Sequence, residues 1–455
     1  MNSVGLQERK IKRMLTVADI IAATTGKVIR MTPDSFTGIS IDSRKIQKGE
    51  LFVALRGSRF DGHDFLDEAL KKGGGAIVSQ TGDFPEDKTI IYVKDTLKAL
   101  QDIAHFMRLK RGIPVVGITG SNGKTTTKEL AASVLSTAYR VLKNTGNLNN
   151  SIGLPLSLTE IDEEDEIVVL EMGASAQGEI KELCDIAIPN YGVLTNIGPS
   201  HLEGFGNLAV VRKTKLEILD TVNIAVVNAD DLFMMEGIRE SGFRGMLVRY
   251  GIQNQAEILA SEIRLQEKSS SFLLHTPGGD PVEVCPKISG MFNIYNVLAA
   301  AAVGYLFRVD LGDIKSAIDS FEGVPMRLEF RDWEGAGIIS DVYNANPASM
   351  EEALKELVRI KRKRAVAVLG DMLELGPYEE EAHRKIGRLL SELPVEILIA
   401  VGPRMAFAAS EFKGLVYTLP SASEAGRLLR EIREKGDTIL IKGSRAMHME
   451  KVLEA

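Results

Sequence analysis

One short segment of the chain combines three glycines, several hydroxyl side chains and a lysine. It covers residues 117–127 and reads Gly-Ile-Thr-Gly-Ser-Asn-Gly-Lys-Thr-Thr-Thr. Glycines let backbone N–H groups turn inward around anionic oxygens, and the adjacent lysine and hydroxyl supply a positive charge and a ligand for Mg²⁺. The segment therefore predicts a phosphate-binding loop built around Gly123, Lys124 and Thr125.

The spacing of this loop departs from the strict G-x4-G-K-[ST] pattern, because position 118 is isoleucine. An ordinary glycine-rich turn is therefore an alternative. The context favours phosphate binding, since an apolar strand is predicted at 114–119 and a helix at 128–138. A helix N-terminus adds partial positive charge. We expect a nucleotide to contact Gly120, Ser121, Asn122, Gly123, Lys124, Thr125 and Thr126.

Two further polar residues follow apolar runs that read as parallel strands. Glu171 closes the run 167–171, and His201 ends the loop after the run 192–195. The carboxyl ends of parallel strands face the ligand crevice, so Glu171 is placed to ligate magnesium and His201 lies at the crevice edge. A solvated glutamate and a structural histidine are the alternatives. Lys213 and Lys215 lie on a predicted helix, where spacing alone indicates a solvated lysine face.

Strand-like and helical patterns alternate along the chain, and the sequence pattern changes near residues 92 and 324. We predict an α/β protein of three domains: a small α/β domain (1–92), a central P-loop-type domain with a mostly parallel sheet (93–324) and a C-terminal Rossmann-like domain (325–455). Strands are predicted at 38–41, 51–55, 76–79, 114–119, 167–170, 192–195, 224–228, 337–340, 365–369, 397–401 and 438–441. Helices are predicted at 16–24, 96–110, 128–138 and 291–307, with an antiparallel stretch at 258–284.

Composition narrows the class of protein further. The 455 residues carry a net charge of −7, which argues against a nucleic-acid-binding surface. Cys184 and Cys285 give neither metal-binding spacing nor a disulfide framework. The longest apolar run, 297–307, is shorter than the ~20 residues that span a bilayer, and Asp19 interrupts the apolar stretch near the N-terminus. We expect a cytoplasmic monomer without a membrane span or nucleic-acid partner.

Several motifs together resemble one family. They are Thr-Gly-Ser-Asn-Gly-Lys-Thr at 119–125, Asn-Leu-Asn-Asn at 147–150, Glu-Met-Gly at 171–173, His-Leu-Glu-Gly at 201–204, Asn-Ile-Tyr-Asn at 293–296, Pro-Met-Arg at 325–327 and Asp-Val-Tyr-Asn at 341–344. With this set the chain resembles the Mur ligase family, ATP-dependent amide-forming enzymes of peptidoglycan synthesis. The resemblance covers almost all of residues 14–455.

The resemblance implies roles for residues that spacing alone does not assign. The N-terminal domain would hold a UDP-sugar, with Ser43 and Arg44 near the nucleotide. Asn293 and Asn296 would contact adenine, while Arg327 would reach the phosphates and Asp341 the ribose. Asn149 and Asn150 would bind substrate. The C-terminal domain would help to bind the incoming D-alanyl-D-alanine, through Tyr343, Asn344, Asn346 and Ser349.

The resemblance also implies a catalytic set and its metals. Two Mg²⁺ ions would be held by Thr125 and Glu171 and by His201 and Lys215, and the family pattern makes Lys215 a carbamylated lysine. The catalytic residues would be Lys124, Glu171, His201, Lys215 and Arg327. An anionic carbamate can ligate magnesium, whereas an ammonium would repel it.

Three stretches narrow the implied substrates: residues 342–350, 369–376 and 441–447. They resemble the family members that join D-alanyl-D-alanine to UDP-N-acetylmuramoyl-tripeptide through an acyl phosphate. Other Mur or folate-polyglutamylating ligases remain alternatives, as does a P-loop NTPase that acts as a switch. A nucleotide-binding scaffold without catalysis is disfavoured by the combination of Lys124, Thr125 and Glu171.

Overall fold

The computed structural model describes residues 14–57 and 60–454 of the chain. These residues form two compact units. The first unit contains the chain up to residue 117 together with residues 139–173 and 181–191, and the second contains residues 118–138, 174–180 and 192 onward. Residues 1–13 of the first predicted domain lie outside the described residues.

The first unit begins with a five-stranded sheet of order β2-β7-β6-β5-β4, in which only β2 is antiparallel to its neighbour. A separate antiparallel pair joins β1 and β3. The elements are β1 (Leu15–Thr16), α1 (Val17–Thr24), β2 (Lys27–Arg30), β3 (Ser35–Phe36), β4 (Ile39–Ser40), β5 (Leu51–Val53), the 3-10 helix η1 (Gly62–Phe65), α2 (Leu66–Lys72), β6 (Gly75–Val78), β7 (Thr89–Tyr92) and α3 (Thr96–Arg111).

The strands of this sheet bury alternate residues on opposite faces, as the two-residue period of a strand requires. Leu51, Val53 and Ile77 pack with residues of α1 and α3 on one face. Phe52 and Ala76 pack with residues of α2 on the other face. Both faces are therefore covered by helices.

A nine-stranded sheet has the order β16-β15-β14-β13-β12-β11-β8-β10-β9. Its strands are β8 (Val115–Thr119), β9 (Val141–Lys143), β10 (Ile167–Glu171), β11 (Tyr191–Leu194), β12 (Ile224–Asn228), β13 (Met246–Gly251), β14 (Ile258–Leu265), β15 (Ser270–His275) and β16 (Val282–Val284). Strands β12 to β14 pair in parallel, and β14, β15 and β16 pair antiparallel. The antiparallel stretch predicted at 258–284 is thus confirmed.

The helices that accompany this sheet follow the predicted alternation. They are α4 (Lys124–Leu135), α5 (Gly153–Leu158), α6 (Glu179–Ala187), α7 (Leu202–Phe205), α8 (Leu208–Leu216), the 3-10 helix η2 (Glu217–Asp220), α9 (Leu232–Ser241), α10 (Met291–Leu306) and α11 (Leu311–Ser320). Helix α10 is almost wholly buried, because seven of its residues between 297 and 303 are apolar and inaccessible.

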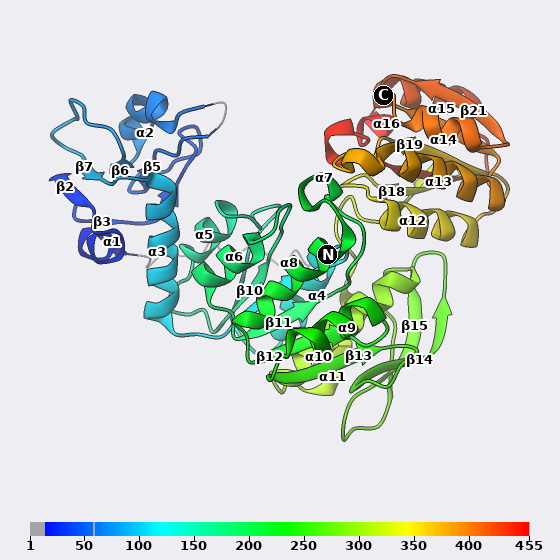
Figure 1. Ribbon diagram of the computed structural model, residues 1–455, viewed down its shortest axis with the longest axis horizontal. Helices are drawn as coiled ribbons and strands as arrows, with labels where there is room; N and C mark the ends of the chain where they lie inside the picture. The colour runs from blue at the N-terminus through cyan, green and yellow to red at the C-terminus, as the bar shows by residue number, and fades with distance from the viewer. Residues whose placement is uncertain (1–13, 58–59, 455) are drawn as a thin grey trace. The chain divides into compact units, whose positions relative to one another are not determined.

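The C-terminal sheet has the order β17-β18-β22-β19-β20-β21 and is parallel except for the edge strand β17. Its elements are β17 (Glu329–Trp333), β18 (Ala336–Asp341), α12 (Pro347–Arg359), β19 (Ala365–Gly370), η3 (Gly376–Tyr378), α13 (Glu379–Glu392), β20 (Ile397–Val401), α14 (Met405–Glu411), β21 (Leu415–Leu419), α15 (Ala422–Ile432), β22 (Thr438–Lys442), η4 (Arg445–Met447) and α16 (Lys451–Glu454). Figure 1 shows these helices gathered around β18 and β19.

Two apolar clusters cover the two faces of this C-terminal sheet. Ile339, Leu369 and Leu440 face α12, α13 and α14, while Val368 and Ile441 face α15 and α16. Successive strand residues therefore enter different cores, which is the arrangement of a doubly wound sheet. The predicted α/β class and Rossmann-like C-terminal sheet are confirmed, and the exact domain boundaries stay predictions.

The predicted elements agree with the structure at their centres and differ at their ends. The helix predicted at 128–138 begins at Lys124, so the phosphate-loop lysine and Thr125 lie in its first turn. Edge strands such as β17 and β21 were not predicted, because their residues are mostly partly exposed rather than continuously apolar.

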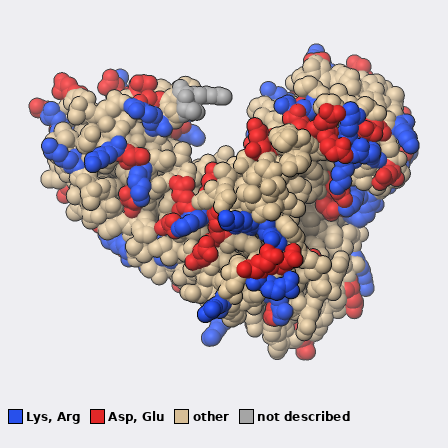
Figure 2. All heavy atoms as spheres, in the orientation of Figure 1, with Lys and Arg blue, Asp and Glu red and all other residues tan. Residues whose placement is uncertain are grey.

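Charges of both signs are intermixed on the surface displayed in Figure 2. On α13, for example, Arg384 pairs with Glu380 at 2.9 Å and with Glu411 at 3.1 Å. Surface pairs of this kind are screened by solvent and contribute little to stability. Among the described residues, no helix has both the length and the apolar character needed to cross a membrane.

Candidate active site

The predicted phosphate loop connects the buried strand β8 to helix α4 in the second unit. Gly123 precedes the helix with φ +82°, and Gly120 has φ +143°. A Cβ on Gly123 would lie 2.3 Å from Oδ1 of Asn296, and one on Gly120 would lie 2.0 Å from Oγ1 of Thr195. Both positions therefore require glycine for conformation and for space.

A neighbouring loop after β11 braces this segment. The backbone N–H of Ser121 donates to the Asn196 carbonyl (2.9 Å), and that of Asn122 donates to Asn196 Oδ1 (3.0 Å). Ser121 Oγ donates to the Gly198 carbonyl (2.8 Å), and Thr195 Oγ1 donates to the Asn122 carbonyl (2.6 Å). Ser121 and Asn122 thus hold the loop in shape, a role that the motif alone did not reveal.

Two cations meet at the loop. Nζ of Lys124 donates to the carbonyls of Gly120 (2.8 Å) and Ser121 (3.2 Å), which places the ammonium over the turn. Nη2 of Arg327 donates to Oγ1 of Thr125 (2.9 Å), and its guanidinium stacks 4.1 Å from the ring centroid of Tyr343. The structure therefore brings Lys124, Thr125 and Arg327 together, as the resemblance implied.

Asn293 and Asn296 lie on α10 and are buried. Nδ2 of Asn293 donates to the Ser289 carbonyl (2.7 Å), and Nδ2 of Asn296 donates to Oδ1 of Asn293 (3.0 Å). Asn296 also accepts a hydrogen bond from Oγ1 of Thr127 on α4 (3.2 Å). The two asparagines are thus linked to the helix that begins at the phosphate loop.

Lys215 is buried, so the solvated lysine face that spacing indicated is wrong for this residue. Its Nζ donates to the Ala174 carbonyl (3.2 Å) and lies 5.3 Å from the ring centroid of Phe205. Burial, with the positive charge of Lys124 as a further cause, lowers the pKa of Lys215 from 10.5 to about 7. Lys213 on the same helix is exposed, as the spacing predicted.

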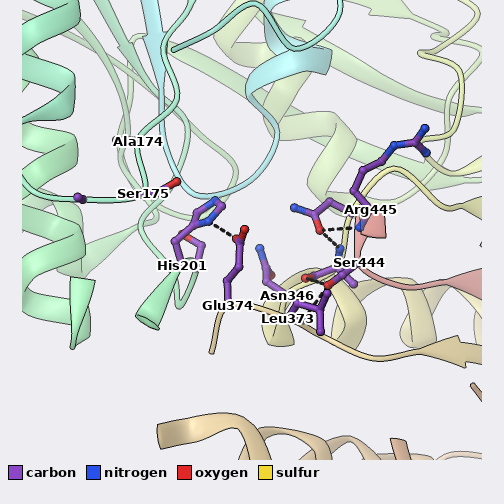
Figure 3. A network of polar contacts seen from close by, with 12 residues as sticks. Ala174, Ser175, His201, Asn346, Leu373, Glu374, Ser444 and Arg445 are labelled. Atoms are coloured by element: carbon purple, nitrogen blue, oxygen red, sulfur yellow. Dashed lines mark hydrogen bonds and ion pairs between the residues drawn. The ribbon is translucent and has the colours of Figure 1, made fainter. Parts of the chain in front are cut away.

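His201 has a left-handed backbone (φ +50°) and pairs with a carboxylate that the sequence did not single out. Its Nδ1 lies 2.5 Å from Oε2 of Glu374, as Figure 3 shows. The hydrogen bond from His201 lowers the pKa of Glu374. The Glu374 carbonyl also accepts from the backbone N–H of Glu203 (3.0 Å). The loop 371–376 therefore contacts the loop that carries His201.

Glu171 lies in the first unit at the end of β10 and is buried. Its Oε1 accepts from Nδ2 of Asn149 (2.7 Å), and its backbone N–H and carbonyl bond to the side chain of Asn144 (2.8 and 3.0 Å). Asn149, predicted to bind substrate, thus orients the predicted metal ligand. Oδ1 of Asn150 accepts from the N–H of Gly153 (2.9 Å) at the start of α5.

The predicted UDP-sugar residues lie in the N-terminal sheet region of the first unit. Ser43 Oγ donates to Glu68 Oε2 (2.9 Å). The exposed Arg44 makes two bonds to Asp42, at 2.9 and 2.8 Å, and these bonds hold the pKa of Asp42 at about 2. Both side chains are anchored beside the loop that follows β4.

The predicted dipeptide residues cluster after β18 in the second unit. Asn346 is the N-cap of α12 and forms a capping box with Ser349, and its Nδ2 donates to Oδ1 of Asn122 in the phosphate loop (2.8 Å). Oδ1 of Asn344 accepts from the N–H of Ala345 (2.9 Å). Oδ2 of Asp341 accepts from Nζ of Lys442 (2.5 Å). Lys442 is a partner to which no sequence pattern assigned a role.

Of the donors predicted for magnesium, Thr125, Glu171 and a carbamate on Lys215 would suit a hard divalent cation, whereas the imidazole of His201 is a nitrogen donor. A hydroxyl, a carboxylate and, with the carbamate, a second anionic oxygen group are the ligands that Mg²⁺ prefers. Within residues 14–57 and 60–454, no group of three or more His, Cys, Asp and Glu side chains is arranged to hold a metal.

A doubly wound C-terminal sheet and a phosphate loop with two cations are features of nucleotide-using α/β enzymes, and comparison with known families gives the class. Residues 35–108 match the Mur ligase family, catalytic domain; residues 118–304 match the Mur ligase middle domain; and residues 326–445 match the Mur ligase, glutamate ligase domain. The chain belongs to the Mur ligase family.

Individual relatives are similar over nearly the whole chain. A Bacillus subtilis protein named UDP-N-acetylmuramoyl-tripeptide–D-alanyl-D-alanine ligase is 35% identical, with 92% of each chain covered. MurF from Acinetobacter baumannii has a TM-score of 0.90 at 33% identity, covering 97% of this chain and 98% of its own. MurF from Thermotoga maritima, solved in complex with ADP, has a TM-score of 0.81 at 31% identity, covering 92% and 96%.

Proposed function

We propose that this protein joins D-alanyl-D-alanine to UDP-N-acetylmuramoyl-tripeptide with hydrolysis of ATP to ADP and phosphate. Relatives that carry this activity in their names align with more than nine-tenths of the chain. The observation that carries the proposal is the meeting of Lys124, Thr125 and Arg327 at one phosphate loop. A loop with two cations is suited to a reaction in which a carboxylate must approach a phosphate.

The chemistry follows from the substrates. A carboxylate is a poor electrophile, so one of its oxygens first attacks the γ-phosphorus of ATP, and the bond to the β-γ bridging oxygen breaks to release ADP. The amine of D-alanyl-D-alanine, after losing a proton, then attacks the acyl carbon. The tetrahedral intermediate expels phosphate, which carries away the former carboxylate oxygen, and the amide nitrogen loses its second proton.

Lys124 and Arg327 have the central task in the first step, because two anions must meet there. Positive groups fixed before the reaction stabilise the charge that develops on the transferring phosphoryl oxygens. Arg327 is held by Thr125 and by the face of Tyr343, so its guanidinium is oriented without substrate. Positioning and electrostatics therefore account for most of the catalysis.

Thr125, Glu171, His201 and Lys215 would hold two Mg²⁺ ions, with Lys215 acting as a carbamate. Bound Mg²⁺ would neutralise phosphate charge. The carbamate forms when the neutral Lys215 amine bonds to CO₂ and releases a proton, and the pKa of about 7 makes the neutral amine abundant near neutrality. Two side chains of α8, Lys213 and Lys215, differ in burial, and the buried one is proposed for this role.

A direct spectroscopic test of the carbamate uses enzyme equilibrated with ¹³C-bicarbonate. We expect one carbamate resonance in the ¹³C spectrum of the wild type that is missing in Lys215→Met. A Lys213→Met variant serves as the control, because that side chain is exposed. Identical spectra for the wild type and Lys215→Met would exclude the modification.

The remaining substrate roles complete the proposal. Ser43 and Arg44 bind the UDP-sugar, Asn293 and Asn296 the adenine, and Asp341 the ribose. Asn149 and Asn150 bind substrate, and D-alanyl-D-alanine is bound by Tyr343, Asn344, Asn346 and Ser349. Asn149 also donates to Glu171, and Asn346 donates to Asn122 in the phosphate loop. In this proposal the protein acts as a monomer in the cytoplasm.

Acceptor dependence tests the proposal. Phosphate release is measured with ATP and UDP-N-acetylmuramoyl-tripeptide, in its diaminopimelate and lysine forms, while the acceptor is varied. We expect turnover with D-alanyl-D-alanine and not with single amino acids or glutamate. Turnover with a single amino acid would indicate another ligase of the family, and equal turnover without any acceptor would indicate an NTPase switch.

A further inference from the structure

Lys442 is a buried cation at the carboxyl end of β22, with 2% of its side chain exposed. Its Nζ donates to Oδ2 of Asp341 (2.5 Å) and to the carbonyl of Asn344 (3.0 Å). Asp341 is itself buried, and its Oδ1 accepts from the backbone N–H of Leu328 (3.4 Å). One ammonium therefore joins both ends of the segment 341–344.

The position of β22 in the sheet extends this effect to a second loop. Strand β22 lies between β18 and β19, so its carboxyl end is flanked by the loops that follow both strands. Oγ of Ser444 accepts from the N–H of Leu373 (2.8 Å) and donates to the Ala345 carbonyl (3.4 Å). The N–H of Ser444 donates to the Asp371 carbonyl (3.1 Å). Residues 442–444 thus hold the loops 341–346 and 371–376 together.

Each of these two loops reaches the phosphate-loop region of the same unit. Asn346 donates to Asn122, and Glu374 pairs with His201. Figure 3 shows Asn346, Leu373 and Ser444 side by side, with Glu374 pointing towards His201. A displacement at the end of β22 would therefore move side chains that the proposed function assigns to nucleotide and to dipeptide.

We propose that Lys442 is a positioning residue that sets the nucleotide-binding Asp341 and the dipeptide-binding segment 343–346 in one geometry. The inference rests on the proposed function. A buried carboxylate that loses its cationic partner is left with an uncompensated charge, so it moves towards water and takes its loop with it. Asp341 would then leave the ribose position, and Asn344 and Asn346 would lose their fixed backbone.

The test compares Lys442→Met, which keeps the side chain's length without its charge, with Lys442→Gln, which keeps a donor. We expect KM for ATP and for D-alanyl-D-alanine each to rise about tenfold or more in the Met variant, because small misplacements of binding groups carry large kinetic costs. KM for the UDP-linked tripeptide should change less than about twofold. The Gln variant should be intermediate, and both should bind ADP–Mg²⁺ more weakly by titration calorimetry.

A matched control lies at the other end of the same strand. The buried Asp437 comes just before β22 begins, and it pairs with Arg364, whose Nη2 lies 2.7 Å from Oδ2 of Asp437. Arg364→Met should lower the melting temperature and leave all three KM values unchanged. If Lys442→Met does not fold, the KM values and the ADP–Mg²⁺ affinity of Lys442→Gln test the inference instead.

Unchanged KM values for ATP and the dipeptide in a folded Lys442 variant would overturn the inference, as would an equal rise for all three substrates. The proposed function fails separately, because it requires acceptor-dependent turnover by the wild type. If that turnover is absent, the affinity for ADP–Mg²⁺ can still be compared between the wild type and the variants by titration calorimetry.

Discussion

At the scale of single residues, the strongest prediction from sequence concerned the phosphate loop, and its geometry agrees. Gly120 and Gly123 adopt positive φ angles and leave no room for a Cβ, so their identity is fixed by local physics that a sequence pattern can express. The pattern also located Lys124 and Thr125. It could not show that Ser121 and Asn122 would be bonded to Asn196, because that contact joins two separate loops.

Replacement of Lys124 tests this loop most simply. We expect Lys124→Met to lower kcat/KM for ligation by about 100-fold or more, since removing a preorganised positive group from a charge-stabilising site has effects of this size. Two of its hydrogen bonds are to the carbonyls of Gly120 and Ser121 in the loop itself, and the variant is checked for its fold. Steady-state kinetics with circular dichroism measures both. An active variant with normal kinetics would remove Lys124 from the mechanism.

The depressed pKa of Lys215 makes a prediction about stability. Between pH of about 7 and 10.5 the unfolded chain binds a proton at this lysine that the folded chain has released. The free energy of unfolding of the wild type should therefore rise with pH across this window, relative to Lys215→Met, and should run parallel to it below pH 7. Urea denaturation in CO₂-free buffers measures the difference. A difference that is constant from pH 6 to 10 would contradict the burial argument.

At the scale of elements, continuous apolar runs located most interior strands of the three larger sheets, but not β7 or β13. Strands such as β8, β10 and β19 are buried along their whole length, so their composition alone marks them. The edge strands β17 and β21 were not predicted, because their residues are partly exposed and do not form a continuous apolar run. Helix α4 was predicted to begin at residue 128, but in the structure it begins at Lys124 and its first turn contains three threonines, which are weak helix formers.

Helix α12 shows how an element and a site can share one residue. Asn346 was predicted to bind substrate, and the structure makes it the helix N-cap and a donor to Asn122. Asn346→Asp keeps the capping oxygen and loses the donor, so stability should be retained while KM for ATP rises about fivefold, the equivalent of roughly 1 kcal/mol. Asn346→Ala should impair both properties.

The control for this helix is another cap in the same sheet domain. Ser421 caps α15 by accepting from the N–H of Glu424. Ser421→Ala should cost about 1 kcal/mol of stability and leave KM for ATP unchanged. Thermal unfolding and initial-rate kinetics on the three variants separate capping from the contact with Asn122. An Asn346→Asp variant with unaltered kinetics would show that this contact has no role in nucleotide binding.

At the scale of the whole molecule, the motifs predicted the family and the α/β class, and the comparisons confirm both. Long-range partners were beyond sequence reasoning. The contacts of His201 with Glu374 and of Lys442 with Asp341 each join residues more than one hundred positions apart, and neither has a periodic signal. Lys442 and Glu374 lay within stretches recognised as resembling the family, but no spacing argument gave them a role.

The central claim is that ATP transfers its γ-phosphoryl group to a carboxylate of the tripeptide. UDP-N-acetylmuramoyl-tripeptide labelled with ¹⁸O in its terminal carboxylate is incubated with the enzyme, ATP and D-alanyl-D-alanine, and the phosphate released is analysed by ³¹P NMR. The account predicts one ¹⁸O atom in each phosphate formed, because the acyl phosphate bridge oxygen leaves with phosphorus. Phosphate without the label, formed at the same rate as the UDP-N-acetylmuramoyl-pentapeptide product, would contradict it.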